Sequence, residues 1–328
     1  KAFARCGAHG MSAIVALTAQ NTLGVTSIAE QSAGFVRDQI RAVLDDIGAD
    51  AAKTGMLFSS AIIEAVADEL AGRRLPLVVD PVMVASSGSR LLLPDAVATL
   101  TGRLFPLATV VTPNLPEAQA LTGLDTEDRA ALAERLVAMG AGAALVTGGH
   151  GANPADHLFD GRTHLSIPVA RHDIAATHGA GCTHSAALAA GLAAGLSLPD
   201  AARQAAAVAG DAVAHGLVGI GSGDGPVHVL HALREASAPA PAAHPATTLR
   251  LAAGHDRRLR TRGDHDRARY VPYMARSIVR RRGGPGRETG LAVGIEVLVS
   301  PVTSGYSRSL GSLQQASSSA AYCRGHKR

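Results

Sequence analysis

The strongest chemical signal in the sequence is the loop His178-Gly179-Ala180-Gly181-Cys182-Thr183, which precedes an alanine-rich helix expected over residues 185–196. Glycine lets the backbone approach a ligand closely, and a helix N-terminus offers unpaired N–H groups with positive potential. This combination suits phosphate and stabilises charge on a transferring phosphoryl group. A helix N-terminus also favours the thiolate of Cys182, which could accept a proton from an attacking hydroxyl. A buried structural cysteine explains the spacing equally well.

A second group of polar residues follows two predicted strands. Asp80 comes directly after the apolar run 77–79, while Asn114 and Glu117 lie where a strand ends and a helix begins between two prolines. Two carboxylates and an amide around one crevice can hold Mg²⁺ directly or through water. Helix capping by Asn114, with Glu117 in the first turn, is the commoner role for such a pair.

Two further segments carry weaker signals. Gln20 and Asn21 present donors and acceptors that could recognise the edge of a heteroaromatic ring, although a plain polar turn explains them as well. Thr147-Gly148-Gly149-His150-Gly151 could approach the phosphates of a nucleotide or simply form a turn, and neither a Walker loop nor a dinucleotide fingerprint occurs. Three histidines lack the pairing typical of zinc ligands and are expected in turns or in solvent: His172, His178 and His184.

Apolar runs that alternate with amphipathic segments must position these residues. Strands are expected at residues 13–17, 51–57, 77–80, 109–112 and 143–147. One helix is indicated by the spacing of Val36, Ile40, Val43, Leu44 and Ile47, a second by capping at Ser59 or Ser60, and a third by residues 126–128 at its start. This alternation predicts an α/β fold with a mostly parallel sheet, whose ligands bind beyond the C-terminal strand ends.

Charge divides the chain into two parts. Residues 237–328 hold 16 basic and 5 acidic residues, a net charge of +11, whereas residues 1–236 carry −7. The sequence pI of 9.2 for the whole chain therefore reflects the basic tail. No nucleic-acid partner is expected for the acidic body. Aromatic residues make up 3% and Trp is absent, which disfavours stacking on single strands. We expect a folded domain at 1–236 and a basic, disordered tail at 237–328, with one possible strand at 291–299.

The remaining composition concerns compartment and membrane. Three cysteines cannot form a disulfide framework in 328 residues, which favours a reducing, cytoplasmic compartment. Residues 174–199 lack Asp, Glu, Lys and Arg but consist mostly of small residues. A membrane span needs about 20 predominantly apolar residues, so we interpret this run as a glycine loop and a buried, alanine-rich helix.

Taken together and in order, these segments resemble the hydroxymethylpyrimidine/phosphomethylpyrimidine kinases of thiamine biosynthesis, in the ribokinase-like superfamily. The matching segments are residues 7–12, 16–22, 53–57, 79–83, 112–118, 147–150, 178–183 and 225–228. The resemblance covers about residues 1–236. It implies a three-layer α-β-α sandwich and a cytoplasmic homodimer that needs ATP and Mg²⁺. Such enzymes phosphorylate 4-amino-5-hydroxymethyl-2-methylpyrimidine and then its monophosphate.

The resemblance also assigns roles to individual residues. Cys182 matches the proposed catalytic base, with Gly179, Ala180 and Gly181 as the anion hole. Around the pyrimidine lie the matches Gln20, Met56 and Val82. Asp80 and Glu117 match the magnesium region. The nucleotide side is matched by Asn114, Thr147 and Gly149.

Three departures from the family pattern bear on these expectations. The family's first strand and its glycine-rich substrate loop have no counterpart here, which predicts a sheet without that central strand and an incomplete pyrimidine site. Ala180 stands where the family usually has threonine, so one hydroxyl is lost while the backbone donors remain. Residues 238–328 have no counterpart in the family. Two alternatives stay open: a pyridoxal kinase of the same superfamily, and a kinase fold that binds ligand without turnover.

Overall fold

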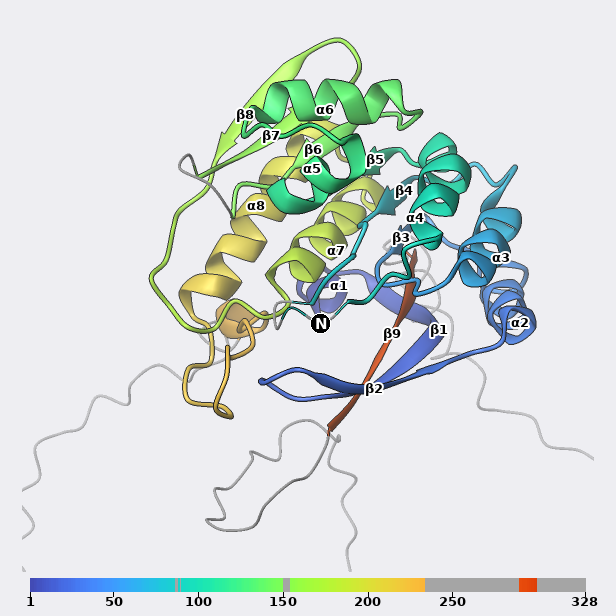
Figure 1. The fold of residues 1–328 in the computed structure, drawn as a ribbon, viewed down its shortest axis with the longest axis horizontal. Helices are drawn as coiled ribbons and strands as arrows, with labels where there is room; N and C mark the ends of the chain where they lie inside the picture. The colour runs from blue at the N-terminus through green and yellow to red at the C-terminus, as the bar shows by residue number, and fades with distance from the viewer. Residues whose placement is uncertain (86–87, 89, 150–153, 234–288, 300–328) are drawn as a thin grey trace, which may run out of the picture. The chain divides into compact units, whose positions relative to one another are not determined.

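The computed structural model describes residues 1–85, 88, 90–149, 154–233 and 289–299. Within them, nine strands form one mixed sheet in the order β2-β1-β9-β3-β4-β5-β6-β7-β8 (Figure 1). The strands are β1 (His9–Gln20), β2 (Val25–Glu30), β3 (Ala51–Thr54), β4 (Leu77–Val79), β5 (Val110–Val111), β6 (Ala144–Val146), β7 (Ala155–Phe159), β8 (His164–Pro168) and β9 (Thr289–Val299). The four strands β3 to β6 are parallel, and antiparallel strands flank them on both sides. All five strands expected from apolar runs are confirmed.

Helices cover both faces of the sheet, which confirms the three-layer α-β-α sandwich. One core cluster unites the sheet with α2 (Ala33–Leu44), α3 (Ser60–Leu70), α4 (Ala96–Thr99), α5 (Leu115–Thr122) and α6 (Arg129–Ala138). The other packs α1 (Ala2–Arg5), α7 (Ala180–Ala193) and α8 (Leu198–Ala214) on the opposite face. Short η1 (Leu100–Leu104) and η2 (Phe105–Leu107) continue α4.

The parallel strands β4, β5 and β6 are continuously apolar because both of their faces are buried. In β4, Leu77 and Val79 belong to one core cluster, while Val78 between them belongs to the other. Side chains of a strand alternate between its two faces, so a strand covered on both sides needs an apolar residue at every position. The alternating polar and apolar pattern of an exposed sheet is therefore absent from these strands.

Side-chain N-caps that the sequence indicates stand at the starts of α3 and α6. Ser59 caps α3 by accepting a hydrogen bond from the Ile62 amide, and Asp128 caps α6 through the amides of Ala130 and Ala131. The expected apolar face of α2 is correct for Val36 and Ile40, which are fully buried. It is wrong for Ile47, which lies beyond the end of α2 and is 57% exposed. The helix expected at 185–196 begins earlier, at Ala180.

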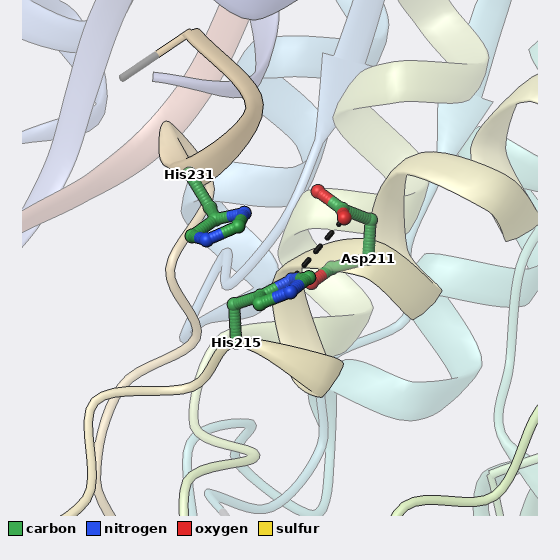
Figure 2. A group of neighbouring side chains, drawn as sticks. All are labelled: Asp211, His215 and His231. Carbon is green, nitrogen blue, oxygen red and sulfur yellow. Dashed lines mark hydrogen bonds and ion pairs between the residues drawn. The ribbon is translucent and has the colours of Figure 1, made fainter. Parts of the chain in front are cut away.

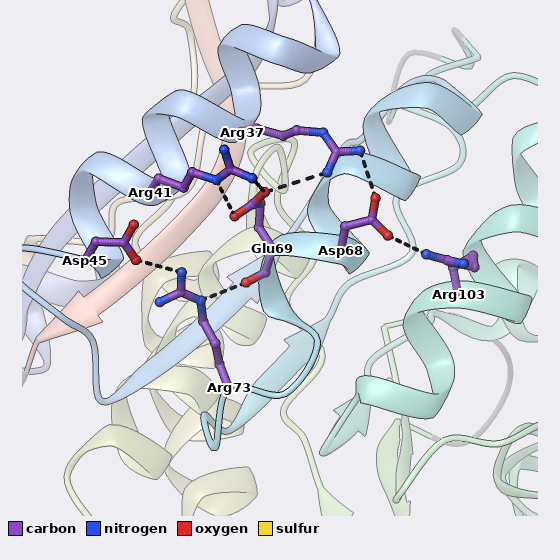
Figure 3. Close-up of polar contacts among 7 residues, drawn as sticks. All are labelled: Arg37, Arg41, Asp45, Asp68, Glu69, Arg73 and Arg103. Carbon is purple, nitrogen blue, oxygen red and sulfur yellow. Dashed lines mark hydrogen bonds and ion pairs between the residues drawn. The ribbon is translucent and has the colours of Figure 1, made fainter.

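A network of ion pairs joins α2 to α3 (Figure 3). The buried carboxylate of Glu69 accepts hydrogen bonds from Nε and Nη2 of Arg41, at 2.9 and 2.7 Å. Arg37 and Arg103 both pair with the exposed Asp68, and the hydrogen bond from Arg37 is the main cause that lowers the Asp68 pKa. Solvent screens exposed pairs, so Glu69 is the member of this network that matters most for the packing of the two helices.

The centre of the sheet holds a strand from the C-terminal tail. β9 lies between β1 and β3 and is antiparallel to both, with Val297 paired to Met11 on one side and to Ala52 on the other (Figure 1). The possible strand at 291–299 is thus confirmed, with bounds 289–299. The described part of the tail, residues 289–299, therefore belongs to the sheet. The expected sheet with a strand missing is replaced by one in which β9 separates β1 from β3.

Among the described helices, none combines the length and apolar character that crossing a membrane requires.

Deletion of residues 288–328 should destabilise the protein. Without β9, the ladders that join it to β1 and to β3 are lost, and each of these strands keeps a partner on one side only. Since each backbone hydrogen bond contributes about 1 kcal/mol net, we expect the free energy of unfolding to fall by about 3 kcal/mol or more. Urea unfolding followed by circular dichroism measures this. Deleting only residues 300–328 is the matched control and should leave the midpoint unchanged. Equal midpoints for both deletions would contradict a structural role for β9.

Candidate active site

Four loops meet where the parallel strands end. The amide of Asp80, directly after β4, donates to the carbonyl of Thr54 at the end of β3. In the same way Thr112 donates to Val79, and Thr147 donates to Pro113. Asn114 and Thr147 form an isolated parallel bridge. The sequence prediction that Asp80, Asn114 and Thr147 share one edge of the sheet is therefore confirmed.

Asp80 is fixed by helix α7. Its carboxylate is 6% exposed, and Oδ2 accepts a hydrogen bond of 2.8 Å from Oγ of the fully buried Ser185. Ser185 lies three residues after Cys182, one helical turn further along α7. Sequence reasoning missed Ser185, although a serine within an alanine-rich apolar helix is a usable signal, because a buried hydroxyl needs a partner. This contact places the start of α7 beside the carboxylates at the strand ends.

Glu117 has the capping role that the sequence left open, and it also lies near Asp80. It forms a capping box with Asn114: the Asn114 side chain accepts from the Glu117 amide at 2.9 Å, and Glu117 accepts from the Asn114 amide at 3.0 Å. Burial, and after it the negative charge of Asp80, raise the Glu117 pKa to about 7 against the opposing effect of the Asn114 and Met83 amides. A buried and a half-buried carboxylate that repel each other form a place where a cation is favourable.

The first turn of α7 carries the predicted phosphate loop. Gly179 is the N-cap with φ of +87°, a left-handed conformation that favours glycine. Cys182 is exposed, so the alternative of a buried structural cysteine is wrong. The Ala180 amide donates to the carbonyl of Thr177 at 3.0 Å, so this amide is already engaged within the turn. An anion bound here would therefore rely on the rest of the first turn.

A pocket of about 160 Å³ lies next to this loop. Its lining residues are Gln20, Asn21, Thr22, Leu23, His178, Gly223 and Asp224. The amide and hydroxyl of Thr177 both donate to Asp224, and the His178 amide donates to Gly225, so the glycine-rich segment 223–225 is bound to the phosphate loop. The pocket thus joins the end of β1, where Gln20 lies, to the residue before Gly179. Sequence reasoning missed that Asp224 and His178 line this pocket.

The other predicted pyrimidine contacts lie elsewhere. Met56 is 2% exposed and belongs to the hydrophobic core, and the half-buried Val82 packs against the same core. Neither lines the pocket that contains Gln20. The structure therefore brings Gln20 to the phosphate loop without the two apolar residues that were expected beside it.

The loop after β6 is held by a buried pair of a histidine and a carboxylate. A Cβ atom on Gly148 would collide with the backbone of Ala155, so this position requires glycine, whereas the space around Gly149 is open. The Gly148 amide donates to Oδ1 of Asp156, whose Oδ2 contacts Nε2 of His184 at 2.9 Å. His184 is 5% exposed, so its expected place in a turn or in solvent is wrong. His150 and Gly151 lie outside the described residues.

A second set of possible metal ligands lies at the C-terminal end of α8, where atoms of Asp211, His215 and His231 come within 4.8 Å of one another (Figure 2). The two imidazole rings stack with centroids 3.5 Å apart and planes 6° from parallel. An imidazole nitrogen binds a metal in the plane of its ring at about 2 Å, so rings stacked in this way cannot aim at one ion. Asp211 also pairs with Arg5 at 2.8 Å. We interpret the group as a packing contact.

Comparisons with known proteins agree with this geometry. A family model described as phosphomethylpyrimidine kinase matches residues 1–228. The hydroxymethylpyrimidine/phosphomethylpyrimidine kinase of Rhizobium meliloti is 47% identical over 238 residues, 70% of this chain and 90% of the relative. Among solved structures, phosphomethylpyrimidine kinase from Clostridium difficile is 33% identical with a TM-score of 0.56, covering 63% of this chain and 87% of that one. An ADP complex of Bacillus subtilis pyridoxal kinase is 34% identical with a TM-score of 0.65, covering 71% and 90%. The chain belongs to the phosphomethylpyrimidine kinase family and is a kinase.

Proposed function

We propose that the protein transfers the terminal phosphoryl group of ATP to 4-amino-5-hydroxymethyl-2-methylpyrimidine and then to its monophosphate, as a step of thiamine biosynthesis. The observation that carries this proposal is the hydrogen bond between Ser185 and Asp80, because it anchors α7, whose first turn carries the exposed Cys182, to the strand end that holds the Asp80 carboxylate. Family membership and the Rhizobium relative, whose name includes both substrates, support the same conclusion.

Cys182 is the base in this proposal. Its thiolate accepts the proton of the substrate hydroxyl as that oxygen forms its bond to phosphorus and the bond from phosphorus to the ADP oxygen breaks. The N-terminus of α7 stabilises the negative charge on the oxygens of the transferring group. The exposure of Cys182 fits this role, since a base must reach the substrate.

Asp80 and Glu117 would hold Mg²⁺. Their fit rests on the donor set, since both are carboxylates, Asp80 is buried and Glu117 is half-buried. Burial and the charge of Asp80 raise the Glu117 pKa, and a nearby cation would favour its charged form. Mg²⁺, when bound, neutralises charge on the phosphates of the nucleotide. Asn114 and Thr147, bridged to each other at the same edge, would lie on the nucleotide side with Gly149.

Gln20 would recognise the pyrimidine. Its carboxamide offers a donor and an acceptor, which match the amino group and adjacent nitrogen of an aminopyrimidine edge. The pocket that it lines suits a single small ring. Met56 and Val82 would act only as the apolar support behind the site. We further propose a kinase domain at residues 1–236, a homodimer and a cytoplasmic location.

A pyridoxal kinase is the second candidate, favoured by the similarity to the Bacillus subtilis enzyme. Coupled ADP-release assays with hydroxymethylpyrimidine, its monophosphate and pyridoxal distinguish the two. We expect turnover of both pyrimidines, and the second phosphorylation is the decisive reaction because a pyridoxal kinase does not need it. Turnover of pyridoxal alone would overturn the proposal. Calorimetric binding of pyrimidine without ADP release would indicate a fold that binds ligand without catalysis.

The Glu117 pKa predicts a pH-dependent stability. The folded, ligand-free protein holds this proton more tightly than the unfolded chain does, so its stability should fall as pH rises from about 5 to about 8. The size is at most about 3 kcal/mol, at 1.36 kcal/mol per pKa unit. Mg²⁺ competes with the same proton, so its affinity should rise over the same range. Urea unfolding and calorimetry at several pH values measure both quantities. Glu117→Gln keeps an acceptor for the capping box and should flatten both profiles; unchanged slopes would contradict this account.

Two substitutions should change different kinetic parameters. Cys182→Ala removes the base and should lower kcat about 100-fold or more with ADP affinity unchanged, because a base acts in the transition state. Gln20→Ala should raise KM for the pyrimidine about tenfold and change kcat little. Steady-state kinetics with ADP titrations provide the test. Near-normal kcat in Cys182→Ala would reduce Cys182 to a structural role.

A further inference from the structure

A buried imidazole–carboxylate pair links α7 to the loop after β6. Nε2 of His184 lies 2.9 Å from Oδ2 of Asp156, and the side chains are 7% and 3% exposed. Because a carboxylate only accepts hydrogen bonds, Nε2 carries the proton and donates it. His184 lies two residues after Cys182, and Asp156 is the second residue of β7. The pair therefore bridges the helix of the phosphate loop and a strand at the other side of the site.

The second oxygen of Asp156 holds the backbone of the loop itself. Oδ1 accepts a hydrogen bond of 2.7 Å from the Gly148 amide, within the segment Thr147–Gly149. Gly148 is packed so closely against Ala155 that no side chain fits there. The loop is thus fixed at one point by sterics and by one carboxylate, and that carboxylate is oriented by His184.

The imidazole is not explained by core packing alone. Its Nδ1 is buried without a hydrogen-bond partner among the described residues, and a buried, unpartnered nitrogen is unfavourable. The side chains that follow it along α7 include Ala186, Ala187 and Leu188, all buried and apolar. An apolar residue at 184 would avoid the penalty, so the contact to Asp156 is the feature that distinguishes histidine at this position.

His184 and Ser185 are consecutive in the chain, and each donates a hydrogen bond to a buried carboxylate. Ser185 donates to Asp80 beyond β4, and His184 donates to Asp156 in β7. Two neighbouring residues of one helical turn therefore fix the metal-side carboxylate and the nucleotide-side loop relative to the same helix N-terminus.

We propose that His184 and Asp156 are positioning residues that set the distance between the Thr147–Gly149 loop and the first turn of α7, and thereby the affinity for the phosphates of the nucleotide. The inference rests on the proposed function, since it assumes that nucleotide phosphates lie between these two segments. Phosphates that span two rigid groups of donors bind best when the spacing is fixed in advance.

Three substitutions at the pair test this. Asp156→Ala removes the support of Gly148 and should raise KM for ATP and Kd for ADP about tenfold. His184→Leu leaves the carboxylate without its orienting partner and should raise both about threefold. Asp156→Asn retains an oxygen for the Gly148 amide and should restore values close to those of the wild type. KM for the pyrimidine should stay unchanged in all three.

Glu69→Gln is the matched control. It perturbs the contact between the buried Glu69 carboxylate and Arg41, which joins α2 to α3 and is far along the chain from the site. It should lower the melting temperature without changing either nucleotide constant. Calorimetry with ADP and steady-state kinetics with ATP supply the readouts, and circular dichroism confirms folding. If Asp156→Ala does not fold, the contrast between His184→Leu and Asp156→Asn carries the test.

The outcomes separate the two levels of inference. Altered melting temperatures with unchanged ADP affinity in every variant would overturn the positioning role and leave the proposed function intact. Equal losses for ATP and pyrimidine would also overturn it, since they indicate general disruption. A wild-type protein that does not bind ADP would overturn the proposed function and the positioning role together.

Discussion

The hydrogen bond from Ser185 to Asp80 is the contact on which the arrangement of the site depends. It joins a helix on one face of the sheet to a carboxylate at the end of a central strand, and both partners are buried. A buried carboxylate needs hydrogen bonds to compensate for lost hydration, so the sheet edge requires α7 to lie where it does. This position of α7 also determines where three other features lie. They are the glycine turn that begins the helix, the exposed thiol of Cys182 and the pocket beside His178.

The charges of the site follow from the same burial. The body of the chain carries a net charge of −7, and two of its acidic groups lie close enough together for Asp80 to help raise the pKa of Glu117 to about 7. A site for a polyanionic nucleotide thus contains few fixed positive side chains and relies on a helix N-terminus instead. The basic residues of the tail supply the high pI of the whole chain.

Sequence reasoning recovered the parallel strands, the layers and the order of the motifs, because these depend on local periodicity and on turn residues. Ser59 and Asp128 show this, since each caps its helix as its position predicts. It could not recover contacts between distant segments. Ser185, Asp156 and Asp224 carry no local pattern, and their partners are set only when the chain folds. Met56 shows the converse, because a residue type that suits a ligand also suits a core.

The position of β9 has a consequence for how the protein is made. β1 and β3 leave the ribosome early, yet the strand that pairs with both is synthesised near the end of the chain. Contacts between residues so far apart in sequence are slow to form, because the entropy cost of closing a long loop comes before any contact stabilises the chain. The ladders that join β1 and β3 to β9 must therefore wait for translation to reach residue 299, while α3, β4, β5 and β6 can assemble beforehand. During this interval, half-made chains expose the unpaired sides of β1 and β3, and exposed strand edges favour aggregation.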